Sequence, residues 1–497
     1  MADMNLFLRN FLLLSIPILF LFGCKHAGGD KAKITIRSRS QTNAEVRVIH
    51  YAALDQRTIA ESKTDSTGSS LFEIILQKPM FVNIQIGEKY SEIYLAPGYD
   101  LQINEAGQEY KIPFTFSGKG ANVNNYISWV NTAVEGIKWA KGKGLNELTY
   151  EEFLNRFDSL KTTINRFHNS YIDSVALPND LSVKLQYKNS IKFFEVAQEY
   201  KFYKLNDRLN KKWEAQNNGK DYLEAKVSNE FENLAKEVPF DSTLLEDGYN
   251  DYQTLLNYYW HSHINLRVSE QLLVSKAQAS LMPLMANALI KKGDYPEAIR
   301  EFLIAFDLQY RFRENGITPE TDSVFNSFRE TYHHSVYLAA LNKDYDAWLA
   351  IAPGKPAPKL EGYTLDGTKV SIKDLRGKVI YMDVWATWCG PCVAEIPASK
   401  KLQQEFAGDD RIQFLNVSVD SRKPDWQNFL ANDKAWKGLH INIKADKIDS
   451  LYLRYKLLGV PTYILIDQLG NIVNMKAPRP SEAQTMTEIR KLLAKEL

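Results

Sequence analysis

The stretch Val384-Trp385-Ala386-Thr387-Trp388-Cys389-Gly390-Pro391-Cys392 holds two of the three cysteines in this 497-residue chain. The apolar run that leads into it, residues 378–385, is rich in β-branched and aromatic residues and is typical of a buried strand. A helix is expected to follow, because Pro391 suits a first helical turn and residues 392–406 keep an apolar helical period. This order of elements places Cys389 at the N-terminus of a helix.

A cysteine at that position is expected to be reactive. Unpaired N–H groups and the helix dipole favour an anion at a helix N-terminus, so they stabilise the thiolate of Cys389. Cys392 lies one helical turn further on and deeper, close enough to attack a mixed disulfide formed at Cys389. The spacing therefore predicts a redox centre in which Cys389 is the nucleophile and Cys392 is the resolving thiol.

Two other interpretations of the cysteine pair are a structural disulfide and half of a zinc site. A zinc site needs two more cysteine or histidine ligands, and His440 is the only histidine in the C-terminal region. The pairs His261/His263 and His333/His334 have spacings that point to different helix faces. The sequence therefore predicts no metal ion and no other cofactor, and the structural disulfide stays open as the alternative.

The residues around the pair resemble the thioredoxin superfamily, and within it the TlpA/ResA-like branch of membrane-tethered thiol-disulfide oxidoreductases. The branch pattern W-C-x-P-C-x-x-E-x-P is matched by Trp388, Cys389, Pro391, Cys392, Glu395 and Pro397. The segment Gly459-Val460-Pro461-Thr462 resembles the cis-proline segment of the family. The resemblance implies a C-terminal α/β thioredoxin-like domain at residues 352–497.

The pattern of elements in this region agrees with such a domain. Strand candidates at residues 379–385, 412–419 and 463–467 alternate with helical stretches, and a final helix is expected at residues 481–497. Alternating strands and helices predict a central sheet flanked by helices.

The resemblance also implies how a substrate would be held. Carried over, Pro461 lies against the disulfide, and a cis bond before it would leave the N–H and C=O groups of Val460 free to pair with an extended peptide. A trans proline is the more frequent form in general, so the expectation of a cis bond rests on the resemblance. Trp388, Gly390 and Pro391 are expected beside this segment at the substrate-binding surface.

Two carboxylates are candidates for the proton that thiol exchange must move. Asp383 interrupts the apolar strand six residues before Cys389, where thioredoxins have a buried acid, so its pKa should be raised. Glu395, three residues past Cys392, matches the acid of the TlpA/ResA pattern. Either acid could accept the proton of Cys392. The alternatives are a hydrogen-bonded structural acid for Asp383 and a solvated helix face for Glu395.

The first 23 residues are predicted to be a lipoprotein signal peptide. Residues 11–22 are apolar apart from two positions, and this run is too short to span a bilayer, which needs about 20 residues. The sequence Leu21-Phe22-Gly23-Cys24 resembles a bacterial lipobox, in which Cys24 would carry the lipid anchor. Residues 24–32 are then a tether, and export accounts for the small number of cysteines.

Two further domains are predicted between the tether and the thioredoxin-like domain. Residues 33–118 alternate apolar and polar side chains between turn signals, which indicates a small antiparallel β-domain of the sandwich type. Residues 119–350 change to a helical period with cap signals at Thr149 and Thr318, which indicates an all-α middle domain. The chain is therefore expected to be multidomain.

The sequence predicts a cell-envelope enzyme, lipid-anchored and facing the periplasm. Gly390-Pro391 resembles the reducing thioredoxins, so the protein is expected to reduce disulfides of extracytoplasmic cysteine-containing proteins. It would need a membrane electron donor of the thiol-reducing type, and the resemblance implies cytochrome c maturation among its tasks. A net charge of +1 gives no electrostatic case for nucleic acid. The competing hypothesis is an envelope binding or scaffold lipoprotein with a structural disulfide.

Overall fold

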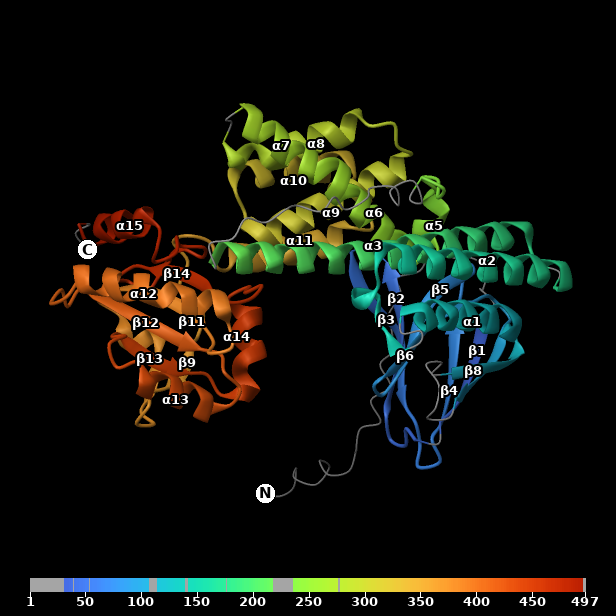
Figure 1. Ribbon diagram of the computed structural model, residues 1–497, viewed down its shortest axis with the longest axis horizontal. Coiled ribbons are helices and arrows are strands. Elements are labelled where there is room, and N and C mark those ends of the chain that lie inside the picture. Colours follow the sequence, from blue (N-terminus) through green and yellow to red (C-terminus); the bar gives the residue numbers. More distant parts are fainter. Residues whose placement is uncertain are drawn as a thin grey trace, which may run out of the picture.

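The computed structural model describes residues 31–38, 40–52, 54–106, 114–138, 142–175, 177–217, 236–275 and 278–494. Figure 1 shows a two-sheet unit in blue, a group of helices in teal to yellow, and an α/β domain in orange to red. The expected multidomain architecture is confirmed. The predicted signal peptide and Cys24 lie outside the described residues. Within the described ranges, none of the helices combines the length and hydropathy needed to span a bilayer.

Two four-stranded sheets form the N-terminal unit, one with the order β4-β1-β7-β8 and the other with the order β3-β2-β5-β6. Every second side chain along these strands points into the space between the two sheets. Ile34, Val48 and Ile103 are fully buried there. The strands are β1 (Lys31–Arg37), β2 (Glu45–Ala52), β3 (Asp55–Lys63), β4 (Ser69–Ile75), β5 (Met80–Ile86), β6 (Lys89–Leu95), β7 (Asp100–Glu105) and β8 (Phe114–Lys119).

Two details of this unit differ from the sequence prediction. Strand β1 begins at Lys31, inside the segment expected to be a tether, because Ala32 is fully buried and pairs with Ile74. The pair of β1 with β7 is parallel rather than antiparallel. The chain changes sheets between β6 and β7, and the alternation of side chains within a strand does not show which neighbour that strand takes.

The middle of the chain is helical, as predicted. Thr149 caps one helix through its side chain, which accepts a hydrogen bond from the Glu152 N–H at 3.2 Å, and Thr318 caps another in the same way. The α-helices are α1 (Ala121–Lys138), α2 (Tyr150–Ser174), α3 (Asn179–Asn217), α5 (Ser242–Glu246), α6 (Asn250–Tyr259), α7 (Leu266–Ser275), α8 (Met282–Lys292), α9 (Glu297–Asn315), α10 (Pro319–Thr331) and α11 (Leu338–Leu349). Short 3-10 turns lie at Leu145–Glu147 and Ala279–Leu281, and a π-helical turn lies at Trp260–Asn265.

The two-sheet unit and the helices share a hydrophobic core. Phe81 of β5 and Tyr94 of β6 are buried among side chains of α1, α3 and α6. Asn124 of α1 ties the two parts together, since its side chain accepts a hydrogen bond from the Tyr94 N–H at 2.7 Å and donates to the Tyr94 carbonyl at 3.0 Å. The helices therefore cover one sheet of the N-terminal unit directly.

The C-terminal domain is built on a seven-stranded sheet with the order β10-β9-β13-β12-β11-β14-β15. Its strands are β9 (Glu361–Tyr363), β10 (Lys369–Ser371), β11 (Val379–Trp385), β12 (Ile412–Ser418), β13 (Leu439–Asn442), β14 (Thr462–Ile466) and β15 (Ile472–Asn474). Its helices are α12 (Gly390–Glu405), α13 (Lys423–Asn432), α14 (Ile448–Arg454) and α15 (Ala483–Leu493), with 3-10 turns at Ile372–Leu375 and Ala445–Lys447.

The central strand β11 determines where the cysteines lie. All seven of its residues are buried, and it pairs with β12 in parallel and with β14 in antiparallel fashion. Because β11 runs directly into α12, the junction between them lies at one end of the sheet centre. The strands predicted at residues 379–385, 412–419 and 463–467 are confirmed, and the final helix is shorter than expected.

Residues 354–357 connect the helical part to the C-terminal sheet. The Gly354 N–H donates to the Ile472 carbonyl at 2.7 Å, and the Ile472 N–H donates to the Lys355 carbonyl at 2.8 Å. The side chain of Ile472 is buried in the same core as the helices. The edge strand β15 is therefore covered by the incoming chain, and the C-terminal domain packs against the helical part through this edge.

Candidate active site

Cys389 and Cys392 form a disulfide at the start of α12, with an S–S distance of 2.01 Å. Cys389 is the N-cap residue of this helix, and its Sγ accepts a hydrogen bond from the Cys392 N–H at 3.2 Å. Pro391 occupies the first turn, where a missing N–H leaves no helical hydrogen bond unmade. The predicted position of Cys389 at a helix N-terminus is confirmed. A negative charge on this sulfur would be stabilised by the N–H groups of the first turn.

The disulfide is buried beneath an exposed rim. Cys389 is 4% exposed and Cys392 is 3% exposed, so burial does not show Cys392 to be the deeper residue. Trp388, immediately before the pair, is 68% exposed, and Gly390 and Pro391 are also exposed. A Cβ added at Gly390 would meet no atom within 4 Å. The space above the pair is therefore open on the side of Gly390.

The peptide bond between Val460 and Pro461 is cis, as the resemblance implied. Both residues are half-buried and stand directly before β14. The antiparallel register of β14 with β11 pairs Thr462 with Val384. This register places the cis-proline segment at the same end of the sheet as the loop that leads into Cys389.

Asp420, which the sequence pattern did not predict as a site residue, holds the loop before Cys389. Its carboxylate is 2% exposed and accepts hydrogen bonds from the Thr387 N–H at 3.1 Å and the Thr387 hydroxyl at 2.7 Å. The Ser418 hydroxyl donates to the same carboxylate at 2.8 Å. Charge-assisted hydrogen bonds of this kind are among the stronger ones. Asp420 therefore fixes residues 386–388 against the end of β12.

A sequence signal for Asp420 exists, although it is indirect. Asp420 follows a buried strand, and the parallel register of β12 with β11 brings the carboxyl ends of both strands together. The side chain of Asn442 on β13 completes the cluster by donating to Ser418 Oγ and to the Asp420 carbonyl, each at 3.0 Å. An acid just after a strand becomes informative only once the strand order is known.

Asp383 is buried on β11, and its Oδ1 atom has no hydrogen-bond donor. Burial, with a smaller contribution from the charge of Glu395, raises the pKa of Asp383 to about 8. Across the sheet it pairs with Tyr463, whose hydroxyl also lacks a partner. The expected rise in the pKa of Asp383 is confirmed, and the alternative of a hydrogen-bonded structural acid is not supported at Oδ1.

Glu395 lies on α12 and is held by the segment before α15. Its carboxylate accepts hydrogen bonds from the Ser481 N–H at 3.1 Å and the Ser481 hydroxyl at 2.9 Å, and the Arg479 guanidinium lies 3.9 Å away. The side chain of Glu395 is 13% exposed. The carboxylate is thus bound in place rather than solvated, and its charge contributes to the raised pKa of Asp383.

The histidine pairs are distant in sequence from this site. His261 and His263 lie on the π-helical turn, where the His263 ring stacks on Tyr259 with a centroid distance of 4.4 Å. In the part of the chain that the structure describes, no group of three or more His, Cys, Asp and Glu side chains is arranged to hold a metal ion.

Known proteins similar to this chain match its C-terminal domain. Residues 352–493 match the Redoxin family. The thioredoxin-like protein YneN of Bacillus subtilis is 33% identical over 124 residues, which is 25% of this chain and 71% of YneN. The chain belongs to the thioredoxin superfamily. The thiol-disulfide oxidoreductase ResA of Bacillus thuringiensis also matches, and these relatives together make the protein a TlpA/ResA-like thiol-disulfide oxidoreductase.

Two further similar proteins are named as thiol-disulfide oxidoreductases. The thiol-disulfide oxidoreductase ResA of Bacillus thuringiensis is 27% identical over 139 residues, which is 28% of this chain and 78% of ResA. The solved thioredoxin domain of a thiol-disulfide oxidoreductase from Bacteroides vulgatus is 30% identical, with a TM-score of 0.26, and the match covers 28% of this chain and 96% of that domain.

The raised pKa of Asp383 makes the stability of the oxidised protein depend on pH. The folded state keeps this proton up to about pH 8, whereas the unfolded carboxyl group has its ordinary pKa of 3.8. The stabilisation is therefore complete below the unfolded pKa and is lost as the pH rises through the folded pKa. Relative to wild type, Asp383→Asn should gain stability by about 1.4 kcal/mol per pH unit between roughly pH 5 and 8.

Denaturant unfolding of both proteins at a series of pH values measures this difference, with hydrogen exchange of residues 379–385 reporting the C-terminal domain. Above about pH 8 the difference should level off, because both states of wild type are then ionised. A difference that stays constant across the whole range would show that Asp383 titrates with an ordinary pKa.

Proposed function

We propose that this protein reduces disulfide bonds of extracytoplasmic proteins at Cys389 and Cys392, while a lipid on Cys24 anchors it in the cell envelope with the catalytic domain facing the periplasm. The observation that carries the proposal is the disulfide at the N-terminus of α12, beside the exposed Trp388. The names of the relatives support the reaction class. The compartment follows from the lipobox-like sequence before Cys24.

The reaction starts from the dithiol form. The Cys389 thiolate attacks one sulfur of a substrate disulfide, forms a mixed disulfide, and releases the other substrate sulfur as a thiolate. Cys392 then attacks the Cys389 sulfur and releases the second substrate thiolate. Two electrons pass from the protein to the substrate, and the protein ends in the Cys389–Cys392 disulfide that the structure contains. The hydrogen bond from the Cys392 N–H supports Cys389 as the nucleophile because it stabilises the thiolate.

The second attack requires Cys392 to lose its proton in a buried site. Burial disfavours a thiolate, so a nearby base is needed. Asp383, with a pKa of about 8, can take up a proton near neutral pH. Glu395 affects this titration through its charge, and Ser481 and Arg479 keep it in position. We therefore assign proton transfer to these two carboxylates acting together.

The substrate is held at the exposed rim of the site. Trp388, Gly390 and Pro391 are exposed and adjoin the two cysteines in the chain. An extended polypeptide beside the cis-proline segment would pair with the backbone of Val460. This surface suits an unfolded or flexible polypeptide that contains a disulfide. A folded substrate would have to present its cysteines on a protruding loop.

The direction of electron flow follows from the residues between the cysteines. Gly390-Pro391 resembles the reducing thioredoxins rather than the strongly oxidising envelope enzymes. After each turnover the disulfide must be reduced again, so the protein needs a membrane electron donor of the thiol-reducing type. Reduction of apocytochrome cysteines during cytochrome c maturation is a task of this kind.

Replacing either cysteine tests the assigned roles. Cys389→Ser should abolish the reduction of insulin disulfides, because it removes the nucleophile. Cys392→Ser should also stop turnover, but it should accumulate a mixed disulfide with insulin that mass spectrometry detects. Cys24→Ser, which removes a cysteine outside the pair, should leave activity unchanged. Insulin reduction that persists in Cys389→Ser would mean that the disulfide is structural.

Replacing either acid tests proton transfer. Glu395→Gln and Asp383→Asn should each slow turnover at neutral pH by about 10-fold or more, the low end of a general-base contribution. Alkylation of Cys389 should not slow in either variant, because the base serves Cys392. Glu405→Gln is a matched control, since Glu405 is exposed at the far end of the same helix and pairs only loosely with Arg490.

The double variant distinguishes shared from separate action. If the two acids share one proton, the double variant should be slower than either single variant, and their titrations should be coupled. Turnover that remains at the wild-type rate in both single variants would leave water as the acceptor of the Cys392 proton.

A further inference from the structure

The backbone that leads into Cys389 forms a turn that a distant side chain holds. The Cys389 N–H donates to the Ala386 carbonyl at 3.1 Å, which closes the turn. Thr387 lies inside the turn and is half-buried, and its N–H donates to the Asp420 carboxylate at 3.1 Å. The Thr387 hydroxyl donates to the same oxygen at 2.7 Å. Two donors of one residue in the turn therefore depend on a single carboxylate.

The Asp420 side chain is itself fixed by its neighbours. The Ser418 hydroxyl donates to Asp420 Oδ2 at 2.8 Å and accepts the Asp420 N–H at 3.1 Å. The Asn442 side-chain amide donates to the Ser418 hydroxyl and to the Asp420 carbonyl, each at 3.0 Å. Both oxygens of the carboxylate thus have donors, and these bonds keep the side chain turned toward Thr387.

These hydrogen bonds join the ends of three neighbouring strands. The parallel register pairs Ser418 of β12 with Trp385 of β11 and with Asn442 of β13. One step further on, the Val419 N–H donates to the Trp385 carbonyl at 2.9 Å. Functional groups of α/β sheets gather at the carboxyl ends of the strands. The rigid centre of the sheet therefore reaches to within a few residues of Cys389.

The placement of the Cys389 backbone decides how well its thiolate is stabilised. Cys389 is the N-cap residue of α12, with φ −87° and ψ 97°, and its Sγ accepts the Cys392 N–H at 3.2 Å. A hydrogen bond weakens steeply as its geometry departs from the ideal, so movement of the preceding turn would reduce this stabilisation. A half-buried Thr387 N–H without an acceptor would favour such movement, because the group would have to turn toward water.

We propose that Asp420 and Thr387 form a positioning pair that holds Cys389 in the geometry in which its thiolate is stabilised. The proposal rests on the proposed function, in which the Cys389 thiolate is the nucleophile. Asp420 acts through the backbone of the turn rather than on the sulfur atom. Loss of the pair therefore makes the Cys389 thiol a weaker acid and the dithiol form less stable relative to the disulfide.

The charge of Asp420 offers a competing explanation for any effect on Cys389. A negative charge near a thiol disfavours the thiolate, so removing that charge would lower the pKa of Cys389. Loss of positioning has the opposite sign and raises the pKa of Cys389. A purely structural role would change the stability of the fold and leave this pKa where it is. The pKa of Cys389 thus separates the three roles.

The pH dependence of Cys389 alkylation measures this pKa in the reduced full-length protein, with iodoacetamide as the reagent and mass spectrometry of the labelled peptide as the readout. Asp420→Asn places an amide N–H₂ against the donors of Thr387 or Ser418. Below the pKa of Cys389, this variant should be labelled about 10-fold more slowly, the loss expected for one hydrogen bond to a charged group. Its midpoint potential should be up to about 30 mV more negative, which is the same factor of ten for a two-electron couple.

Two variants of Thr387 test the same contact without any change of charge. Thr387→Val keeps the branched side chain and removes the hydroxyl that donates to Asp420, so labelling should slow by a smaller factor than in Asp420→Asn. Thr387→Ser keeps the hydroxyl and should be labelled at the wild-type rate. Asp425→Asn is the charge-matched control, because Asp425 is exposed on α13, and it should leave the pKa of Cys389 unchanged.

A lower pKa of Cys389 in Asp420→Asn would overturn the proposal in favour of the charge. Wild-type labelling of both Asp420→Asn and Thr387→Val would overturn it in favour of a structural role. Thr387→Val leaves the bonds of Asp420 to Ser418 and Asn442 in place, so it decides the question even where Asp420→Asn does not fold. Insulin reduction by wild type tests the proposed function separately, because labelling needs reduced cysteines but no turnover.

Discussion

The placement of one sulfur atom at the N-terminus of α12 is the constraint on which the site depends. A fully buried central strand runs directly into that helix, so Cys389 becomes its N-cap residue and accepts the Cys392 N–H. Asp420 fixes the preceding loop from the end of the neighbouring strand. The same strand carries Asp383 into a dry environment, where burial raises the pKa of its carboxyl group to about 8, so that the ionised form is a strong enough base to take a thiol proton. The central strand β11 therefore positions both the helix that begins at Cys389 and the carboxyl group of Asp383.

The sequence predicted those features of the site that depend only on neighbouring residues in the chain. The apolar run before Cys389, the proline in the first helical turn and the acid within the strand each have a meaning at their own position. Asp420 could not be predicted in that way, because its role depends on β12 lying next to β11. The parallel pairing of β1 with β7 could not be predicted for the same reason, because packing between distant segments decides the strand order.

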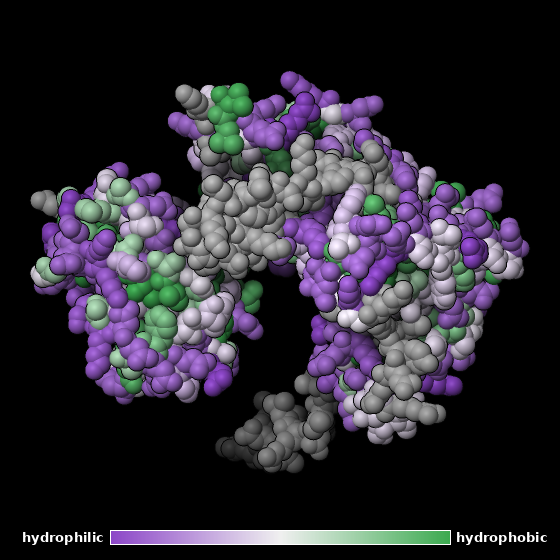
Figure 2. Space-filling model, viewed as in Figure 1, coloured by the Kyte–Doolittle hydropathy of each residue, from purple (hydrophilic) through white to green (hydrophobic). Residues whose placement is uncertain are grey.

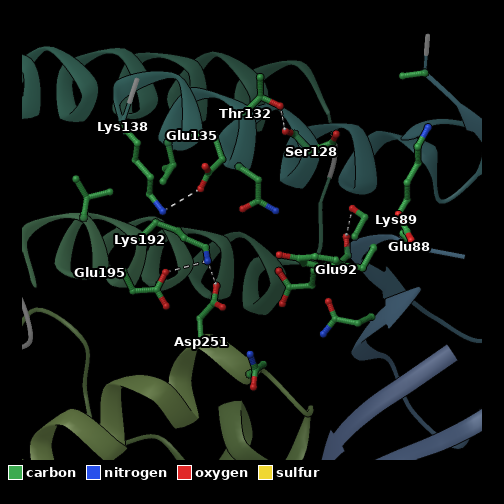
Figure 3. A pocket seen from close by; sticks show the side chains of 18 of the residues that line it. Glu88, Lys89, Glu92, Ser128, Thr132, Glu135, Lys138, Lys192, Glu195 and Asp251 are labelled. Carbon is green, nitrogen blue, oxygen red and sulfur yellow. Dashed lines mark hydrogen bonds and ion pairs between the residues drawn. The ribbon is translucent and has the colours of Figure 1, made fainter. Parts of the chain in front are cut away.

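The two-sheet unit and the helical part of the chain pack into one body and contact the C-terminal sheet. The two-sheet unit and the helices share one core through Phe81 and Tyr94, and Ile472 of the C-terminal sheet reaches into that core. Charged side chains from the sheet and helices meet in a cavity far in sequence from the disulfide (Figure 3). Figure 2 shows a largely hydrophilic surface over these parts, broken by a few apolar spots. Their charged interior distinguishes them from a simple structural linker.

The midpoint potential of the Cys389–Cys392 pair tests the proposed direction of electron flow most directly. Full-length protein would be equilibrated with dithiothreitol buffers of known potential, and the fraction of free thiols would be counted by alkylation and mass spectrometry. We expect a value near that of the reducing thioredoxins, about −270 mV. A value above about −150 mV would contradict the proposal, because the protein would then accept electrons from its partners instead of donating them.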